Sequence, residues 1–149
     1  MLEAADELDL DAPLTIYNAD TTFESPTITT NLGRLGPGLD GLLGVFEAPG
    51  DHWSFARLDD AGRVIETAEK VRISPYATTG LYAFGSARAF VDAGRAMVAE
   101  DDRTRGEFYV APLYNRLISS GAAVEVDHAT KVEALGTPDE LTAFLATHS

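Results

Sequence analysis

The sequence predicts an α/β domain whose sheet contains an antiparallel insertion. Apolar runs of strand length are separated by polar turn signals, but strands and helices do not alternate strictly along the chain. That order disfavours a plain series of βαβ units. Two apolar stripes with helical spacing lie in the second half. At 149 residues the chain has the length of one domain, so residues 1–149 are treated as a single domain.

The first elements predicted are short. Apolar positions within residues 2–8 have the spacing of one face of a short helix. The run PLTIYNAD, residues 13–20, has the composition of a buried strand that ends in polar groups. Residues 25–35 predict a weak helix capped by Ser25, and the glycine-rich stretch 33–38 predicts its end.

The middle of the chain predicts four strands, of which two form a hairpin. The strands are expected over residues 41–48, 53–58, 63–70 and 78–84. The second and third of them are joined by Asp-Asp-Ala-Gly, residues 59–62, which suits a hairpin loop.

Two amphipathic helices follow. The first is capped by Ser86, and its inner face is expected to hold Ala87, Phe90, Val91, Gly94, Met97 and Val98. The second repeats the helical spacing at Val110, Leu113, Tyr114, Leu117 and Ile118. Gly121 is expected to end this second helix.

The C-terminal part predicts two short strands and a helix. The strands are expected over residues 122–127 and 131–135. Thr137, Pro138 and Glu140 then predict a capping box with proline in the first turn of the last helix.

Composition excludes several classes of function. A net charge of −13 disfavours phosphate backbones and anionic lipid surfaces, so neither nucleic acid nor membrane is expected as a partner. The absence of cysteine excludes disulfides, thiolate zinc sites and cysteine nucleophiles. No apolar run approaches the ~20 residues of a membrane span, and the acidic start is unlike a signal peptide. We therefore expect a cytoplasmic protein.

The histidines and the tryptophan carry no recognisable chemistry in the sequence. His52, His128 and His148 are scattered and lack metal-ligand spacing, so they are expected to be solvated surface groups. Trp53 begins a predicted strand and is expected in the core or covering the sheet.

Five strings resemble a known family by their order and approximate spacing. They are NADTTF, AEK, ATTGLY, GEFYVAPLYNRLISSG and LGTPDEL. Together, over residues 12–147, they are similar to the sugar-1-phosphate nucleotidyltransferases, also called nucleoside-diphosphate-sugar pyrophosphorylases. The resemblance implies a Rossmann-like mixed sheet with an antiparallel sugar-binding insertion. It also implies transfer of a nucleoside monophosphate from a nucleoside triphosphate to a sugar 1-phosphate with Mg²⁺.

The family's nucleotide-binding signature has no counterpart. Members begin with a strand and a Gly-rich loop, containing an Arg and later a Pro-Lys pair, that wraps the triphosphate. Residues 31–41, NLGRLGPGLDG, contain glycines and Arg34 but follow the Asp motif instead of preceding it. The resemblance therefore implies a truncated nucleotidyltransferase domain whose first strands are missing and which is poorly active alone. The alternative is a non-catalytic homologue or fragment that serves assembly, regulation or sugar binding.

The truncation has a structural consequence for the strand over residues 13–18. By resemblance this strand has parallel neighbours on both sides, so one of its edges is expected to be exposed. The unpaired N–H and C=O groups of an exposed strand edge can pair with a strand of another chain. We therefore expect a partner chain or a homo-oligomer to cover it.

Four residues are the main site candidates by resemblance. Asp20, after a buried-type strand, would hold the Mg²⁺ that bridges the nucleotide phosphates. Glu69 would accept hydrogen bonds from sugar hydroxyls, and the catalytic candidate Lys70 would contact the sugar phosphate. Because successive strand residues point to opposite faces, this requires a bend at the strand end. Gly80 would let the backbone approach the sugar. Without the resemblance, Asp20 is a turn or cap, Glu69 and Lys70 form a surface ion pair, and Gly80 marks a bulge.

Three further residues are weaker candidates for substrate binding. Glu107 resembles the acid of the family's GE motif near the sugar, although an acid before a helix start also complements the macrodipole. Thr79 and Asn115 are either pocket wall or plain structure.

A second metal ligand is not predicted. Several family branches carry an acid shortly before the last Gly-Thr, where this chain has Ala134 and Leu135. Glu133 is near, but on a strand it should face away from Ala134.

Overall fold

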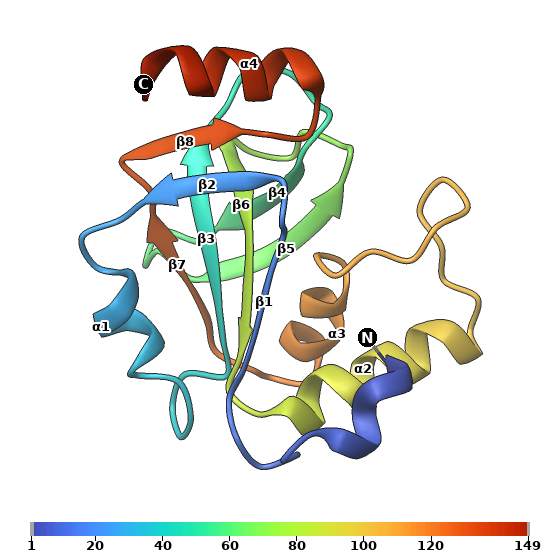
Figure 1. The fold of residues 1–149 in the computed structure, drawn as a ribbon. Coiled ribbons are helices and arrows are strands. Elements are labelled where there is room, and N and C mark those ends of the chain that lie inside the picture. The colour runs from blue at the N-terminus through green and yellow to red at the C-terminus, as the bar shows by residue number, and fades with distance from the viewer. Residues whose placement is uncertain (1, 149) are drawn as a thin grey trace.

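The computed structural model describes residues 2–148, which form a six-stranded mixed sheet, helices on both faces and a separate two-stranded ribbon at one end (Figure 1). The sheet order is β5 (Val64–Glu69), β4 (Ser54–Leu58), β6 (Tyr76–Phe84), β3 (Gly41–Glu47) and β7 (Val124–His128). The sixth strand, β1 (Leu14–Tyr17), pairs with β6. The ribbon consists of β2 (Thr21–Glu24) and β8 (Lys131–Ala134).

The sheet is mostly antiparallel. Strand β3 is parallel to β7 and antiparallel to β6, and β4 is antiparallel to both β5 and β6. The predicted hairpin is confirmed, because β4 and β5 pair antiparallel. In its loop, Asp59 Oδ1 accepts hydrogen bonds from the backbone N–H groups of Ala61 and Arg63. The predicted combination of α/β class and antiparallel insertion is thus found.

Both faces of the central strands are buried. Tyr82 and Phe84 of β6 face the larger core, whereas Leu81 and Ala83 face a smaller apolar cluster on the other side. Alternation along a strand produces this division. It explains why residues 76–84 have no polar face in the sequence.

The helices follow the predicted order with shorter bounds. They are the 3-10 helix η1 (Leu2–Glu7), α1 (Ile28–Leu32), α2 (Ala87–Ala99), α3 (Leu113–Ser119) and α4 (Pro138–Thr147). Helices α2 and α3 cover the larger core, and α1 covers the smaller cluster. Within residues 2–148 no helix has both the length and the apolar character required to cross a membrane.

The predicted caps hold at two helices. Ser86 accepts the backbone N–H of Ala89 at the start of α2. At α4 the full capping box is present, because the Thr137 hydroxyl accepts the N–H of Glu140 and the Glu140 carboxylate accepts the N–H of Thr137. Val98 is the exception on the predicted inner face of α2, since it is 48% exposed.

The predicted helix over residues 25–35 was wrong in extent and in its cap. Helix α1 is little more than one turn, and Thr27, not Ser25, occupies the cap position. The Thr27 hydroxyl makes no cap hydrogen bond because it donates to Asp127 Oδ1 at 2.6 Å. Asn31 Nδ2 donates to the same oxygen at 2.7 Å. A buried carboxylate on β7 thus anchors the helix from outside its own sequence.

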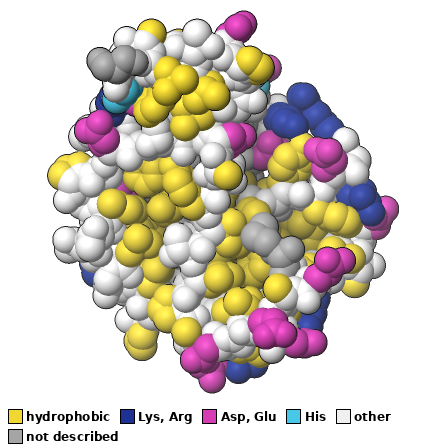
Figure 2. Space-filling view, viewed as in Figure 1, with side chains coloured by type: hydrophobic (Ala, Val, Ile, Leu, Met, Phe, Trp, Pro, Cys, Tyr) yellow, Lys and Arg dark blue, Asp and Glu magenta, His cyan; other side chains and the backbone are white. Residues whose placement is uncertain are grey.

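Strand β1 is an edge strand of the sheet. Its partner is β6, to which it is antiparallel, so the expected parallel neighbour on this side was wrong. The reason is that β1 and β3 flank β6, and both run opposite to it. Among residues 2–148 no strand pairs with the other edge of β1. Hydrophobic side chains gather on this side of the molecule (Figure 2), and Tyr17 is 45% exposed. What covers the edge stays a prediction.

Buried Tyr114 predicts a loss of stability at alkaline pH. Its hydroxyl donates to the Ala83 carbonyl at 2.9 Å, and complete burial raises its pKa well above the ordinary value. The unfolded tyrosine releases its proton near pH 10 while the folded one keeps it, so unfolding releases a proton and the free energy of unfolding falls as pH rises above 10. One such group contributes at most about 1.4 kcal/mol per pH unit.

The expected result is that Tyr114→Phe makes the decline between pH 10 and 11 shallower, as measured by urea unfolding. At pH 8 the same variant should lose about 0.5–1.5 kcal/mol, because the Ala83 carbonyl loses the tyrosine hydrogen bond but still faces its ladder partner in β3. Burial also raises the pKa of Tyr82, so the free energy of unfolding of the variant should still fall somewhat with rising pH. An unchanged slope in the variant would contradict the assignment.

Candidate functional site

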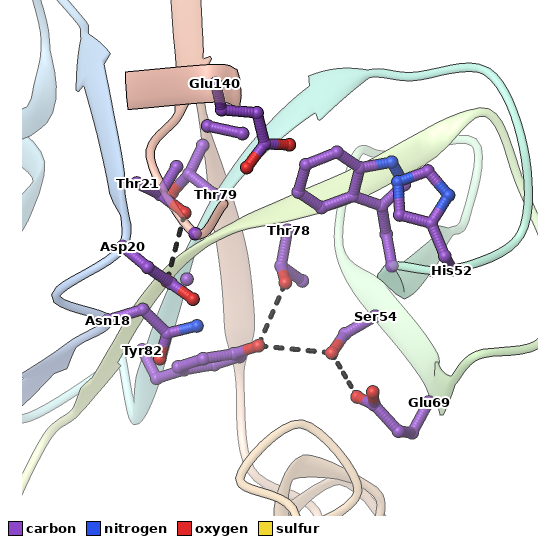
Figure 3. A pocket seen from close by; sticks show the side chains of 14 residues that line it. Asn18, Asp20, Thr21, His52, Ser54, Glu69, Thr78, Thr79, Tyr82 and Glu140 are labelled. Atoms are coloured by element: carbon purple, nitrogen blue, oxygen red, sulfur yellow. Dashed lines mark hydrogen bonds between the residues drawn. The ribbon is translucent and has the colours of Figure 1, made fainter. Parts of the chain in front are cut away.

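A cavity of about 260 Å³ opens where the ends of several strands meet (Figure 3). We call it the acidic cavity. Its lining residues are Asn18, Asp20, Thr21, His52, Trp53, Ser54, Glu69, Thr78, Thr79, Gly80, Tyr82, Ala134, Gly136 and Glu140. Three of them are carboxylates, and none is lysine or arginine. The cavity as it stands attracts cations and hydrogen-bond donors.

The β2–β8 ribbon places Asp20 at one wall of the acidic cavity. The backbone N–H of Leu135 donates to the Asp20 carbonyl at 2.7 Å, which ties the chain before β2 to the chain after β8. A Cβ added to Gly136 would lie 3.3 Å from Asp20 Oδ2 and 3.7 Å from Glu140 Oε2. The two carboxylates therefore converge over a glycine that leaves room for them.

Gly80 forms the floor of the cavity beside Asn18. It has φ 85°, a left-handed conformation that favours glycine, and its carbonyl accepts the N–H of Asn18 at 3.0 Å. A Cβ at this position would meet the Asn18 side chain at 2.8–2.9 Å. The absence of a side chain at Gly80 is thus required both by the backbone conformation and by the space that Asn18 occupies.

Glu69 reaches the cavity from the end of β5 and is only 7% exposed. Its Oε2 accepts a hydrogen bond from the Ser54 hydroxyl. Tyr82 OH donates to Ser54 Oγ at 3.3 Å, and Thr78 Oγ1 lies 2.9 Å from the same phenol oxygen. Burial raises the pKa of Tyr82, so this phenol is a neutral donor at ordinary pH. Figure 3 shows the four side chains in a row.

Lys70 does not line the acidic cavity. It has φ 54°, so the backbone bends directly after β5. Its Nζ donates to Tyr109 OH at 2.5 Å and lies 4.7 Å from the centre of that ring. Tyr109 OH donates in turn to Glu107 Oε2 at 2.5 Å. The hydrogen bond to Tyr109 raises the pKa of Lys70.

Asn115 holds α3 against β5 instead of facing the cavity. Its Oδ1 accepts the N–H of Thr67 at 2.8 Å, and its Nδ2 donates to the Thr67 carbonyl at 2.8 Å. The Asn115 side chain therefore makes the two backbone hydrogen bonds to Thr67 that a neighbouring strand would otherwise make. It contributes to the position of the Glu69 strand, which favours the structural interpretation of Asn115.

The structure brings four of the seven predicted site residues to one cavity: Asp20, Glu69, Thr79 and Gly80. Lys70 and Glu107 lie together on Tyr109 outside it, and Asn115 lies behind β5. Whether these residues bind a ligand stays a prediction for each of them.

Sequence reasoning missed the opposite wall and the second carboxylate. His52 is exposed as expected, yet it lines the cavity mouth with its ring 4.7 Å from that of Trp53. Trp53 covers Phe46 edge-on, and its buried Nε1 has no partner among the described residues. Glu140 was identified only as a helix cap, a role it does fill. Its position across Gly136 depends on the β2–β8 pairing, which no local pattern signals.

The donor set fits a hard divalent cation. Mg²⁺ prefers one or two carboxylates together with ligand phosphates and water. Asp20 and Glu140 supply two carboxylates that converge on one space. Glu133, by contrast, pairs with Lys131 at 3.0 Å and lies apart from the cavity, as the strand alternation predicted. Asp20 and Glu140 are therefore the residues that would hold Mg²⁺.

Comparison with solved structures shows what the chain is similar to. It aligns over 96% of its length with a nucleoside-diphosphate-sugar pyrophosphorylase from Vibrio cholerae RC9, at 38% identity and a TM-score of 0.78. A protein from Bacillus anthracis assigned as a glucose-1-phosphate thymidylyltransferase, in complex with a sucrose, shares the fold at 17% identity and a TM-score of 0.73 over 98% of the chain.

The alignments cover only part of either relative. The chain spans 59% of the Vibrio cholerae protein and 58% of the Bacillus anthracis protein. No protein-family model and no curated protein matches the sequence.

Proposed function

We propose that this chain, which belongs to the sugar-1-phosphate nucleotidyltransferase family, forms the part of a nucleotidyltransferase site that binds the sugar phosphate. The observation that carries the proposal is the convergence of Asp20, Glu69 and Gly80, from three separate segments, on one cavity. The substrates are a sugar 1-phosphate and a nucleoside triphosphate. Transfer of the nucleoside monophosphate would release pyrophosphate.

The residues of the acidic cavity have separate roles in binding the sugar and the metal ion. Glu69 accepts hydrogen bonds from sugar hydroxyls, and Gly80 lets the ring approach the backbone. Asp20 and Glu140 hold Mg²⁺, which supplies charge neutralisation for the phosphates when it is bound. The chain's own contribution is position, because this reaction requires no protein nucleophile.

The carboxylates make cation and phosphate binding interdependent. Asp20, Glu69 and Glu140 repel an incoming phosphate, and the net charge of −13 adds to the repulsion. We therefore expect a sugar 1-phosphate to bind more tightly with Mg²⁺ than without it.

The position of Lys70 favours a second candidate function, sugar-phosphate binding without transfer. Its ammonium is engaged by Tyr109 and lies outside the acidic cavity. In the transfer reaction Lys70 must leave Tyr109 to contact the phosphate. A non-catalytic binding protein would require no such movement.

Asp20→Asn is expected to weaken the Mg²⁺-dependent binding of glucose 1-phosphate by at least about tenfold, because a charge-assisted contact contributes about 1.5–3 kcal/mol. Isothermal titration calorimetry with and without Mg²⁺ measures this. Asp139→Asn is the matched control, since Asp139 is an exposed carboxylate one residue from Glu140 and outside the cavity. Equal affinities in both variants would contradict the proposal.

A pyrophosphate-release assay separates the two candidate functions. It contains the chain, Mg²⁺, a panel of nucleoside triphosphates and the sugar 1-phosphate that binds. Pyrophosphate release supports the transferase, whereas binding without release supports the second candidate.

A further inference from the structure

Glu69 is a buried carboxylate whose two oxygens have different environments. A carboxylate removed from water is costly unless its oxygens are hydrogen-bonded. Oε2 accepts the Ser54 hydroxyl, and no other side chain within residues 2–148 hydrogen-bonds this carboxylate. Glu69 lines the acidic cavity. One oxygen is thus held by the protein while the other is left for a ligand.

The direction of each hydrogen bond in the row can be derived. An ionised carboxylate only accepts, so the single proton of Ser54 is directed to Glu69. The Ser54 oxygen then accepts from Tyr82 OH at 3.3 Å, which uses the phenol's single proton. The phenol oxygen in turn accepts from Thr78 Oγ1 at 2.9 Å. Each hydrogen bond in the row therefore has a fixed donor: Thr78 donates to Tyr82, Tyr82 to Ser54, and Ser54 to Glu69.

The row comes from the rigid centre of the fold. Thr78 and Tyr82 lie on β6, Ser54 begins β4, and Ser54 pairs in register with Glu69 across the β4–β5 ladder. Thr78 and Tyr82 are both buried. A hydrogen-bonded row on paired strands restricts the carboxylate through the oxygen that Ser54 contacts, because buried hydrogen-bond networks make their members rigid.

We propose that Ser54 and Tyr82 are positioning residues that fix Glu69 as an acceptor, so that the acidic cavity selects ligands by a hydroxyl that donates to its free oxygen. This rests on the proposed function, and it deepens it by naming the residues that hold the sugar-binding carboxylate in place. The selected group is a ring hydroxyl, not the phosphate, because an acceptor-only carboxylate repels a phosphate oxygen.

The test is a cycle of variants and ligands measured by calorimetry with Mg²⁺. The ligands are glucose 1-phosphate and its four monodeoxy analogues, and the variants are Ser54→Ala, Ser54→Thr and Tyr82→Phe. Ser54→Ala is expected to weaken the binding of glucose 1-phosphate about tenfold. It should leave the affinity for one deoxy analogue unchanged, because that analogue lacks the hydroxyl from which Glu69 accepts a hydrogen bond. Ser54→Thr should restore most of the affinity.

Tyr82→Phe should show a smaller loss of about two- to fivefold with the same analogue dependence, since Ser54 can still donate but is no longer held. A merely structural role would weaken all five ligands equally and lower the melting temperature. That result, or an unchanged affinity in Ser54→Ala, would overturn the proposal.

A readout without ligand separates this inference from the proposed function. A buried, hydrogen-bonded Tyr82 hydroxyl proton should give a slowly exchanging NMR signal that Ser54→Ala shifts or removes. No such signal in the unaltered chain overturns the positioning row. If the signal is present but glucose 1-phosphate and the other sugar 1-phosphates fail to bind, the proposed function is overturned, and the ligand part of this inference falls with it.

Discussion

Gly80→Ala is expected to lower the free energy of unfolding by about 2–6 kcal/mol and to remove ligand binding by the acidic cavity. Two costs add at this position. A side chain at φ 85° strains the backbone by about 1–3 kcal/mol. The new Cβ would also lie 2.8 Å from Asn18 Cβ, and overpacking of this kind costs about 1–3 kcal/mol. Urea unfolding and calorimetry with glucose 1-phosphate measure the two effects.

Gly62→Ala provides a matched control. Gly62 has φ 81° in the β4–β5 hairpin, nearly the same as Gly80, but a Cβ there would meet nothing within 4 Å. The control should therefore show the backbone strain alone, about 1–3 kcal/mol, with ligand affinity unchanged. Equal destabilisation and equal affinity in the two variants would mean that crowding against Asn18 contributes nothing at Gly80.

The sequence predicted the part of the site that local chemistry signals. Asp20 follows an apolar run, Gly80 interrupts another, and Glu69 ends a third, so each has a recognisable place at or near a strand end. These places converge because β5 joins the sheet through β4, and because β1 pairs with β6 directly before Asp20. Neither a local pattern nor the resemblance predicted that topology, since the resemblance gave β1 a parallel neighbour where β6 is antiparallel.

The remaining parts depend on contacts between distant segments. Glu140 reaches the cavity because Thr21 pairs with Ala134 in the β2–β8 ribbon, and Thr21–Glu24 was not predicted as a strand at all. Lys70 lies outside the cavity and donates to Tyr109, which lies 39 residues further along the chain. Such pairings are set by tertiary packing, which local propensity does not carry.

The second large effect is expected from supplying the part of the fold that this chain does not span. The 149 residues alone, with Mg²⁺, glucose 1-phosphate and a nucleoside triphosphate, should release pyrophosphate only at the background rate. Joining them to the part of the Vibrio cholerae protein that lies outside the aligned region should raise the rate at least about 100-fold. The physical reason is that a single preorganised donor to the transition state contributes about 2.7–4 kcal/mol, and the phosphate-binding loop that the family resemblance implies for the added part would supply several.

The free edge of β1 gives this chimera an independent structural readout. Asn18 N donates to Gly80 O, so by the alternation of an antiparallel pair the N–H groups of Thr15 and Tyr17 point away from β6. These two amides should exchange rapidly in the 149-residue chain and become protected in the chimera. The same chimera carrying Asp20→Asn should keep the protection and lose the activity. Turnover by the 149 residues alone would contradict the requirement for a separate nucleotide-binding part. Unprotected amides in an active chimera would place that part elsewhere than on β1.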